Sequence, residues 1–365
     1  MRQPTTLAIR PVGGDPLFLQ VDAGCWVTPA TTTSAAYDLT GFFALPGLAD
    51  CHAHLAADSL QQVDQGGEIG AIARRAFTQL ATGVLLVIDK GWRDEVVLQL
   101  LDRPPEERPH LEAAGRIITG DQGYFPGFAV EVDNAGLVEA VRAANPKGGW
   151  VKVIGDWPQK GRGPVISFSE ESLTAACAVA HAAGVKVAIH TMAPDTPGMA
   201  VRAGVDSIEH GLYLTEEDVR MLGARGGAWV PTVANTKDVI ANLGPGSSGA
   251  RILGAGLENV RIRLRPAVES GVTVLAGTDL GLAHGEVARE AALLHEYGLT
   301  GPQAVEAAGP AAYRYLGIRF FEPGSGADLV LFGEDPTEDV TALQRPVAAM
   351  RAGRVVFDRV GLGGG

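Results

Sequence analysis

The feature that most limits the possible folds is a repeated alternation between short apolar runs and amphipathic helical patterns. Runs rich in valine and isoleucine recur from about residue 83 to 278, and helical patterns such as 135–145 and 171–184 separate them. Strands and helices that alternate at this spacing indicate a parallel sheet. The expected strands are 83–89, 115–119, 150–155, 185–190, 206–210, 228–233 and 272–279.

The number of these units predicts a barrel. Adding "FALPGLADCH" at 43–52 gives eight strand–helix units, which is typical of a (β/α)8 TIM barrel of the α/β class. The two ends of the chain instead read as short antiparallel strands without helices between them. We therefore expect residues 1–44 and 321–365 to form the two parts of a small β-sandwich, with the barrel at 45–320.

Composition narrows the partners and the compartment. The chain has 365 residues, with 30 lysines and arginines against 42 aspartates and glutamates, so its net charge is −12. No basic stripe is available for nucleic acid or an anionic membrane, and no apolar segment approaches the length of a membrane span. The first residues also lack the apolar core of a signal peptide. Three scattered cysteines without CxxC spacing favour a reducing cytoplasm. With nucleic acid and membrane disfavoured by charge, the expected partner is a small-molecule substrate.

The stretch "LPGLADCHAHL" at 45–55 predicts a metal site. His52 and His54 end the first strand, and functional side chains of a barrel gather at the carboxyl ends of its strands. Residues two apart on a strand point the same way, about 6.6 Å apart, so both imidazoles can close on one ion. Asp50 is positioned to orient one of the rings through its second nitrogen.

The same stretch resembles the opening of the amidohydrolase superfamily, and the resemblance covers nearly the whole chain. It implies a lysine at the end of strand 4, single histidines at strands 5 and 6, and an aspartate at strand 8. The matching residues are Lys152 in "WVKVIGD", His190 in "VAIHTMA", His210 in "SIEHGLYL" and Asp279 in "LAGTDLG".

The resemblance also implies the cofactors. Lys152 would be carboxylated by CO2 and would bridge two divalent ions. The remaining ligands would be His52, His54 and Asp279 for one ion, and His190 and His210 for the other. Imidazole-rich ligation favours zinc, with manganese, cobalt or iron as alternatives. Taken alone, Lys152 also fits a lysine whose stem packs while its amine reaches the strand end.

Two such ions would hold a bridging hydroxide as the nucleophile, because coordination lowers the pKa of water from about 15.7 toward 7. Asp279 would accept a proton from the attacking water and pass it to the leaving group.

The chain most resembles the prolidase-type and imidazolonepropionase-type branch, which implies cleavage of an amide C–N bond in a dipeptide, an N-acyl amino acid or a cyclic amide. It departs from that branch at Met192, where a second histidine is common, and in "TGDQGYFPG" after strand 3. The resemblance further implies an assembly of identical copies.

Other reactions remain open. A lactone, ester or phosphoester hydrolase could use the same site. A mononuclear deaminase is disfavoured, because Ala193 stands where those relatives carry a glutamate. A Schiff-base lyase acting through Lys152 would leave five potential ligands without a role.

Three further residues are candidates for substrate contact, and each has a structural alternative. Tyr124 and Tyr213 could hydrogen-bond the substrate or pack into the core, and His284 could contact substrate or stabilise its loop. The remaining histidines are expected to be structural: His110 in a loop, and His181 and His295 in helices.

Overall fold

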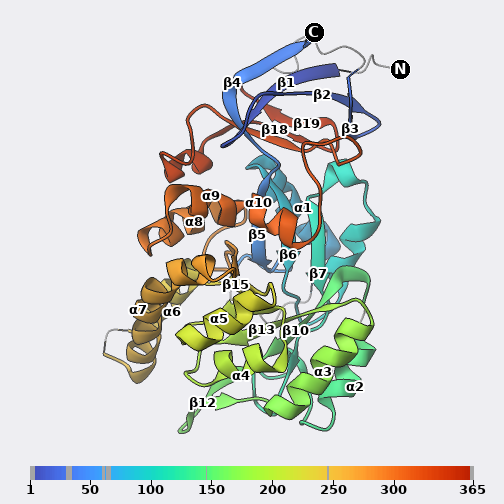
Figure 1. Ribbon diagram of the computed structural model, residues 1–365. Coiled ribbons are helices and arrows are strands. Elements are labelled where there is room, and N and C mark those ends of the chain that lie inside the picture. The colour runs from blue at the N-terminus through green and yellow to red at the C-terminus, as the bar shows by residue number, and fades with distance from the viewer. Residues whose placement is uncertain are drawn as a thin grey trace.

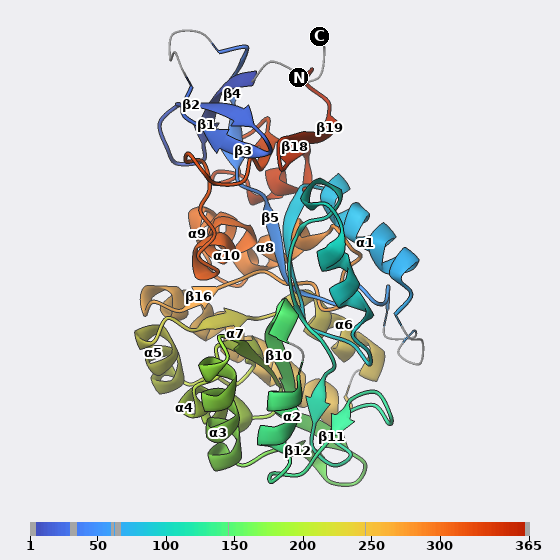
Figure 2. The same ribbon diagram turned by 90° about the vertical axis from the view of Figure 1, so that its right-hand side faces the viewer.

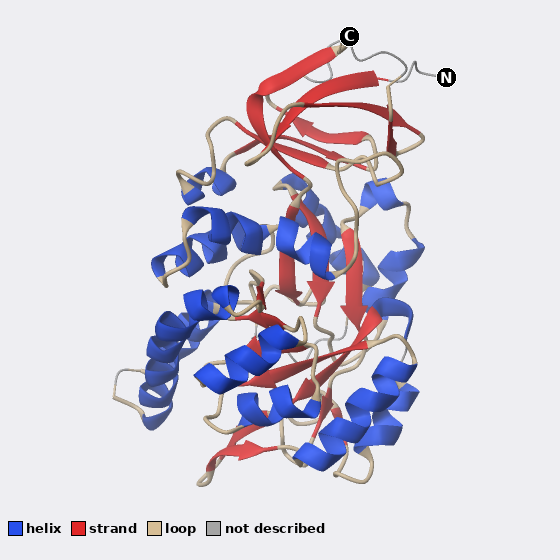
Figure 3. Cartoon of the chain, in the orientation of Figure 1, coloured by secondary structure: helices blue, strands red, loops and turns tan. Residues whose placement is uncertain are grey.

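The computed structural model describes residues 5–29, 35–59, 62, 67–144, 146–244 and 246–361. A curled parallel sheet surrounded by helices makes up most of it, and a second sheet stands at one end, where both termini lie (Figures 1 and 2). Figure 3 shows the contrast: loops join most strands of the terminal sheet, whereas helices flank the strands of the larger sheet.

The larger sheet follows the chain. Its strands pair in parallel in the order in which they occur, and the first two are buried along their whole length, as expected where both faces are covered. They are β5 (Leu48–Ala53), β6 (Val84–Asp89), β7 (His110–Ala114), β10 (Gly149–Ile154), β13 (Lys186–Thr191), β14 (Ser207–His210), β15 (Ala228–Val230) and β16 (Thr273–Val274).

Backbone hydrogen bonds bring the two edges of this sheet together. The amide of Cys51 in β5 donates to the carbonyl of Ala276 at 2.9 Å, and the amide of Asp279 donates to the carbonyl of His52 at 2.7 Å. Gly277 lies between these bonds, and a Cβ at this position would approach the Cβ of His52 to 2.6 Å. The edges meet at the carboxyl ends of the strands, which gives the barrel-like curvature that the eight repeats predict.

Helices connect and cover the strands. Their starts carry the expected capping residues: Thr215 and Thr300 each accept a hydrogen bond from the third helical residue, whose side chain bonds back. The helices are α1 (Ile69–Ala81), α2 (Leu137–Ala143), α3 (Glu170–Ala182), α4 (Thr196–Ala203), α5 (Glu216–Ala224), α6 (Val233–Leu243), α7 (Ser248–Glu269), α8 (Val287–Glu296), α9 (Gly301–Ala308) and α10 (Pro310–Tyr315). Shorter 3-10 helices are η2 (Val96–Asp102), η3 (Pro105–Glu107), η4 (Pro146–Gly148) and η5 (Val340–Gln344).

The terminal sheet joins the two ends of the chain. Its seven strands follow the order β19-β18-β17-β4-β1-β2-β3, so β4 from the first segment pairs with β17 from the last. The strands are β1 (Thr5–Pro11), β2 (Leu17–Asp22), β3 (Cys25–Val27), β4 (Tyr37–Leu45), β17 (Leu329–Phe332), β18 (Pro346–Arg351) and β19 (Arg354–Asp358). The two ends thus meet, as expected. A separate β-sandwich and the exact domain boundaries stay predictions.

The third barrel strand lies earlier than the sequence pattern predicts. The pattern favours 115–119, where only the short strand β8 (Ile118–Thr119) forms, and His110, expected in a loop, begins β7. The run "HLEAA" is a weak signal because Glu112 interrupts it. In the fold, the Glu112 carboxylate accepts a hydrogen bond from the Trp150 indole at 3.1 Å.

Besides β8, three short strands lie outside these two paths. β9 (Val130–Glu131) pairs with β8, while β11 (Asp156–Gln159) and β12 (Gly163–Ile166) form a hairpin directly after β10. Within the described ranges, no helix combines the length and apolar character needed to cross a membrane.

Candidate metal centre

The structure gathers the six predicted ligands at one end of the barrel. Each follows or ends a strand: β5 for the first two, β10, β13 and β14 for the next three, and the segment after β16 for the last. They are His52, His54, Lys152, His190, His210 and Asp279. All line one cavity, and five of the six are buried.

Asp279 lies at the middle of the cluster. Its Oδ1 is 3.3 Å from Nε2 of His52 and 3.1 Å from Nε2 of His54, and its Oδ2 is 3.6 Å from Nε2 of His210. One ligand atom from each of His52, His210 and Asp279 falls within 4.8 Å of the other two. His190 adds a fourth imidazole, whose Nδ1 is 3.0 Å from Nε2 of His210.

Polar contacts on the far side of three rings, two hydrogen bonds and one close approach of a carboxylate, set their orientation. Nδ1 of His52 is 2.7 Å from the Glu209 carboxylate, Nδ1 of His54 donates to the Gly91 carbonyl at 2.7 Å, and Nδ1 of His210 is 2.6 Å from Oγ1 of Thr232. Each contact leaves Nε2 directed at the cluster. Such outer partners fix which nitrogen of a histidine faces a metal.

Asp50 does not orient a ring, contrary to the expectation from the sequence. Its carboxylate accepts hydrogen bonds from the backbone amide and hydroxyl of Thr278 at 3.1 and 2.7 Å, and from Gln79 at 3.3 Å. Asp50 therefore ties β5 to the segment that carries Asp279. It also accepts a hydrogen bond from the backbone amide of His52 at 3.3 Å, rather than from a histidine ring.

A buried ion pair supports the first histidine. Glu209 lies 2.9 Å from the Lys90 ammonium and accepts a hydrogen bond from Ser207 at 2.6 Å, in addition to its contact with His52. The Lys90 ammonium also lies 4.3 Å from the centre of the Trp150 ring. Glu209 and Lys90 are both fully buried. The carboxylate thus links the cluster to a cation in the barrel interior.

Sequence reasoning missed this pair and also Asn235, whose amide donates to Oδ2 of Asp279 at 2.5 Å. Glu209 immediately precedes His210, and a charged residue inside the buried strand "SIEH" was the available signal. Nothing local marks Lys90 or Asn235, because their partners lie on other strands.

Burial sets the protonation of the imidazoles. It lowers the pKa of His52 and His190 well below the usual histidine value and that of His210 to about 3, so these rings are neutral near pH 7. Burial also opposes ionisation of Asp279, but its attraction to His52 and the hydrogen bond from His54 outweigh that effect and hold its pKa at about 2. Burial also disfavours the charged form of His54, but the hydrogen bond and charge of Asp279 outweigh it and raise the pKa of that ring. The cluster is therefore one carboxylate with three neutral imidazoles and a fourth ring, His54, whose charged form Asp279 favours.

Lys152 is the exception in this network. Its side chain is only 2% exposed, and its Nζ has no hydrogen-bond partner among the described residues. Burial lowers the pKa of this amine to about 8. A buried amine without a partner is costly in a folded protein, and such groups mark places where a further group is expected.

Three backbone positions at this rim are strained. His210, Thr232 and Asp279 have φ values of 63°, 48° and 42°, in the left-handed region that residues other than glycine seldom adopt. The Trp229 indole donates to the carbonyl of His210 at 2.8 Å. The hydrogen bond from the backbone amide of Asp279 to the carbonyl of His52 holds Asp279. Strain of this kind concentrates at functional sites.

The cluster forms the floor of a cavity of about 680 Å³. The hairpin β11–β12, α6 and the start of α7 supply much of its wall. Of the three expected substrate contacts, only Tyr124 lines it. The Tyr213 hydroxyl donates to the carbonyl of Ile252 at 2.6 Å, and Nε2 of His284 donates to the carbonyl of Ala57 at 2.8 Å. Substrate contact by these three residues stays a prediction.

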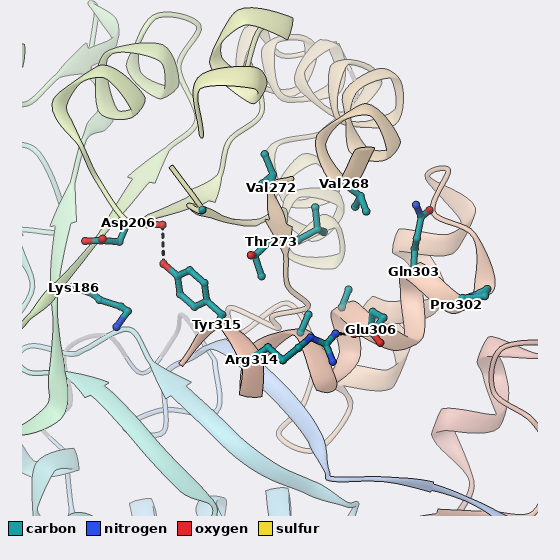
Figure 4. Close-up of a pocket in the computed structure, with 14 residues that line it drawn as sticks. Lys186, Asp206, Val268, Val272, Thr273, Pro302, Gln303, Glu306, Arg314 and Tyr315 are labelled. Carbon is teal, nitrogen blue, oxygen red and sulfur yellow. Dashed lines mark hydrogen bonds and ion pairs between the residues drawn. The ribbon is translucent and has the colours of Figure 1, made fainter. Parts of the chain in front are cut away.

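A second cavity of about 690 Å³ opens where β13, β14 and β16 begin (Figure 4). Several of its polar groups already have partners: the Tyr315 hydroxyl donates to the carbonyl of Asp206 at 2.9 Å, and Arg314 forms an ion pair with Glu306. No set of His, Cys, Asp or Glu side chains close enough to hold a metal was found there among the described residues.

Comparison with known proteins identifies the family. A sequence model described as the amidohydrolase family matches residues 43–356, so the chain belongs to that family. An uncharacterized protein of Mycobacterium tuberculosis is 33% identical over 344 residues, which cover 92% of this chain and 90% of that protein. The ochratoxinase of Aspergillus niger is 23% identical over 370 residues, covering 87% of this chain and 76% of that protein.

Solved structures show the same fold. The crystal structure of a Xaa-Pro dipeptidase with bound methionine matches with a TM-score of 0.81 at 22% identity, over 97% of this chain and 99% of that chain. The crystal structure of the A. niger ochratoxinase matches with a TM-score of 0.79 at 20% identity, over 97% and 96% of the two chains.

The family uses divalent metals in general, and the residues present fit such ions. Imidazole nitrogens and carboxylates are the donors that zinc and similar ions take in proteins, and His52, His190 and His210 are neutral beside the ionised Asp279. The buried Lys152 amine, which has no partner, points to one more group in the cluster. As a free amine it would be a weak ligand, but with CO2 bound it would offer two oxygens.

Proposed function

We propose that this chain is a metal-dependent hydrolase that cleaves an amide C–N bond. The observation that carries the proposal is the buried Lys152 amine, which lacks a partner and lies among four imidazoles and an aspartate. Family membership and structural neighbours named as hydrolytic enzymes support the same class.

Each ligand has a proposed place. His52, His54 and Asp279 would hold one divalent ion, and His190 and His210 the other. Carboxylation would join the Lys152 nitrogen to the carbon of CO2 and release a proton, so that the new carboxylate lies between the two ions. Zinc is the expected metal.

When bound, the two ions would supply a hydroxide nucleophile at neutral pH and polarise the carbonyl of the substrate. The residues of the chain then manage protons and orientation. The Asp279 carboxylate would accept a proton from the attacking water and deliver it to the leaving nitrogen. Asn235, 2.5 Å from its Oδ2, keeps that carboxylate in place while it does so.

The surroundings complete the proposal. A small molecule fits a cavity of this volume, which is within the usual range for ligand pockets.

We also propose a cytoplasmic location, supported by three cysteines that form no disulfide, and a small β-sandwich domain at the terminal sheet. A homo-oligomer remains part of the proposal from the family resemblance.

Metal analysis of paired variants tests the central claim. The wild-type protein should carry close to two divalent ions per chain and hydrolyse members of a panel of amides. Lys152→Ala should lose most of the metal and activity, with partial recovery when a short carboxylic acid is added. Lys186→Ala, at the opposite end of the neighbouring strand, is the matched control and should retain both. Unchanged metal content in Lys152→Ala would remove the bridge, and a wild-type value near one ion would favour a mononuclear mechanism.

A further inference from the structure

The cavity above the cluster has an aromatic wall on one side. The Trp157 ring lies 4.6 Å from Tyr124 and 5.1 Å from Phe125, centre to centre, and 5.6 Å from the ring of His190. All three aromatic residues line the cavity. The wall therefore begins directly beside one of the proposed ligands, where the group attached to a cleaved bond would lie.

A second part of the wall is aliphatic. It comes from α6 and the start of α7, and its apolar side chains are Val239, Leu243, Ile252 and Leu253. Leu243 is 48% exposed, which is unusual for a large apolar residue and places it at the mouth. A bound molecule that contacts both parts of the wall would meet apolar groups on each.

Positive charge is missing from both walls. Among the described residues that line the cavity, Lys152 on the floor is the sole lysine or arginine. The nearest cations in the hairpin, Lys160 and Arg162, are exposed at its turn, and Arg162 donates to the side chain of Gln159 at 2.9 Å. The sequence 60–66 also contains no lysine or arginine.

Backbone amides beside the cavity are not free to bind an anion from the substrate, because a carboxylate of the protein already accepts their hydrogen bonds. The Asp156 carboxylate accepts hydrogen bonds from the backbone amides of Met192 and Ala193 at 3.0 and 3.1 Å. A substrate carboxylate placed against these walls, away from the proposed ions on the floor, would lose its water without gaining a cation from either wall, which costs several kcal/mol by order of magnitude.

We infer that the substrate is a neutral amide with an aromatic or branched apolar group, and that dipeptides and N-acyl amino acids with a free carboxylate are poor substrates. The inference rests on the proposed function for the reaction, but the preference itself depends only on the two walls. The apolar group packs against Trp157 and the aliphatic residues of α6 and α7. Tyr124, which also lines the wall, is half-buried there.

A matched pair of amides tests this on the metal-loaded enzyme. N-Benzoylphenylalanine and N-(2-phenylethyl)benzamide contain the same benzoyl amide and differ only by a carboxylate. We expect kcat/KM to be about a hundredfold higher for the neutral compound, the effect of an unpaired buried charge. Equal values, or a preference for the acid, would overturn the inference.

A second pair separates the preference from the reaction. In 1,4-diphenylbutan-1-one and 2-benzyl-4-oxo-4-phenylbutanoic acid, a methylene replaces the amide nitrogen, so neither can be cleaved at that position. Calorimetry should show tighter binding of the neutral ketone. If that holds while no member of the amide panel is hydrolysed, the proposed function fails and the binding preference stands; tighter binding of the acid refutes the preference whatever the reaction.

Variants of the aliphatic wall provide the reciprocal test. Val239→Arg should raise kcat/KM for the acid relative to the neutral amide by about tenfold, because it supplies the missing cation. Val239→Met, similar in length but neutral, is the control and should leave the ratio unchanged. Leu243→Arg, at a more exposed position on the same wall, makes the same test if the first variant folds poorly. An unchanged ratio in both arginine variants would contradict the inference.

Discussion

The two ends of the barrel hold cavities of nearly equal size and differ in the state of their polar groups. At the amino end, in about 690 Å³, Tyr315, Arg314 and Glu306 already have partners, and the ion pair is exposed (Figure 4). At the carboxyl end, in about 680 Å³, Lys152 is buried without one. The difference teaches that buried polar groups left unsatisfied, rather than volume, mark the place where a ligand belongs.

Two lysines on neighbouring strands make the same comparison. Lys186 begins β13, is partly exposed, and lies with its ammonium 6.0 Å from the centre of the Tyr315 ring. Lys152 lies two residues from the end of β10 and is sealed from water. The position of each lysine along its strand thus determines its exposure: Lys186 reaches solvent, whereas Lys152 is enclosed among the six proposed ligands.

The largest expected difference between the two ends is in activity. Asp279→Ala removes the carboxylate that lies within 3.3 Å of two histidines, and kcat should fall by about 10³-fold or more, because proton transfer and a metal ligand are lost together. Asp206→Ala at the amino end should keep kcat within a few-fold. Steady-state kinetics at saturating metal measures both. A loss of less than tenfold in Asp279→Ala would refute the assigned role.

A smaller difference is expected in stability. Lys90→Met leaves the fully buried Glu209 carboxylate without its cation, and the free energy of unfolding should fall by about 3 kcal/mol. Urea denaturation measures this value. Replacing both residues by neutral ones, as Lys90→Met with Glu209→Gln, should recover part of the loss. If Lys90→Met alone unfolds with the same free energy as the wild type, the ion pair between Lys90 and Glu209 does not contribute to stability.

Metal affinity should respond to the orienting carboxylate. Glu209→Gln removes the negative charge that lies 2.7 Å from Nδ1 of His52, and such outer partners typically change metal affinity by about 10- to 100-fold. Competition with a chelator measures the dissociation constant. Glu306→Gln, at the amino-end cavity, is the control for loss of one negative charge and should leave the affinity unchanged.

The smallest expected effect is at the amino end itself. Arg314→Ala removes an exposed ion pair with Glu306, and the free energy of unfolding should change by less than about 1 kcal/mol. Metal content should be unaffected. A large loss of metal in this variant would show that the two ends are coupled and would break the comparison.

Much of the site follows from local sequence. Strand ends are visible as apolar runs that stop at a polar residue, and the barrel brings all carboxyl ends to one rim, which is how His52 and His54 were selected. The other four residues were selected by the resemblance to the amidohydrolase superfamily, which implies a lysine, two histidines and an aspartate at later strand ends. What surrounds them could not be predicted in either way. The contacts of Glu209 with Lys90 and of Asn235 with Asp279 join residues far apart in the chain, and no local pattern specifies such pairs.

Two errors have the same origin. Asp50 was expected at a ring because it is two residues from His52, yet its carboxylate reaches Thr278 and Gln79 from the adjoining segments. The third strand was placed at 115–119 because Glu112 obscures the apolar run of β7. In both cases a neighbour distant in sequence determined what the residue does.

The terminal sheet has a consequence for how the protein is made. β5, which carries the first two histidines, follows β4 after only two residues, and β4 pairs with β17 near the other end of the chain. During synthesis the N-terminal half leaves the ribosome first, at about 5–20 residues per second. β4, which precedes β5, therefore cannot complete its pairing until β17 has emerged. The candidate site should accordingly assemble only when translation is nearly finished.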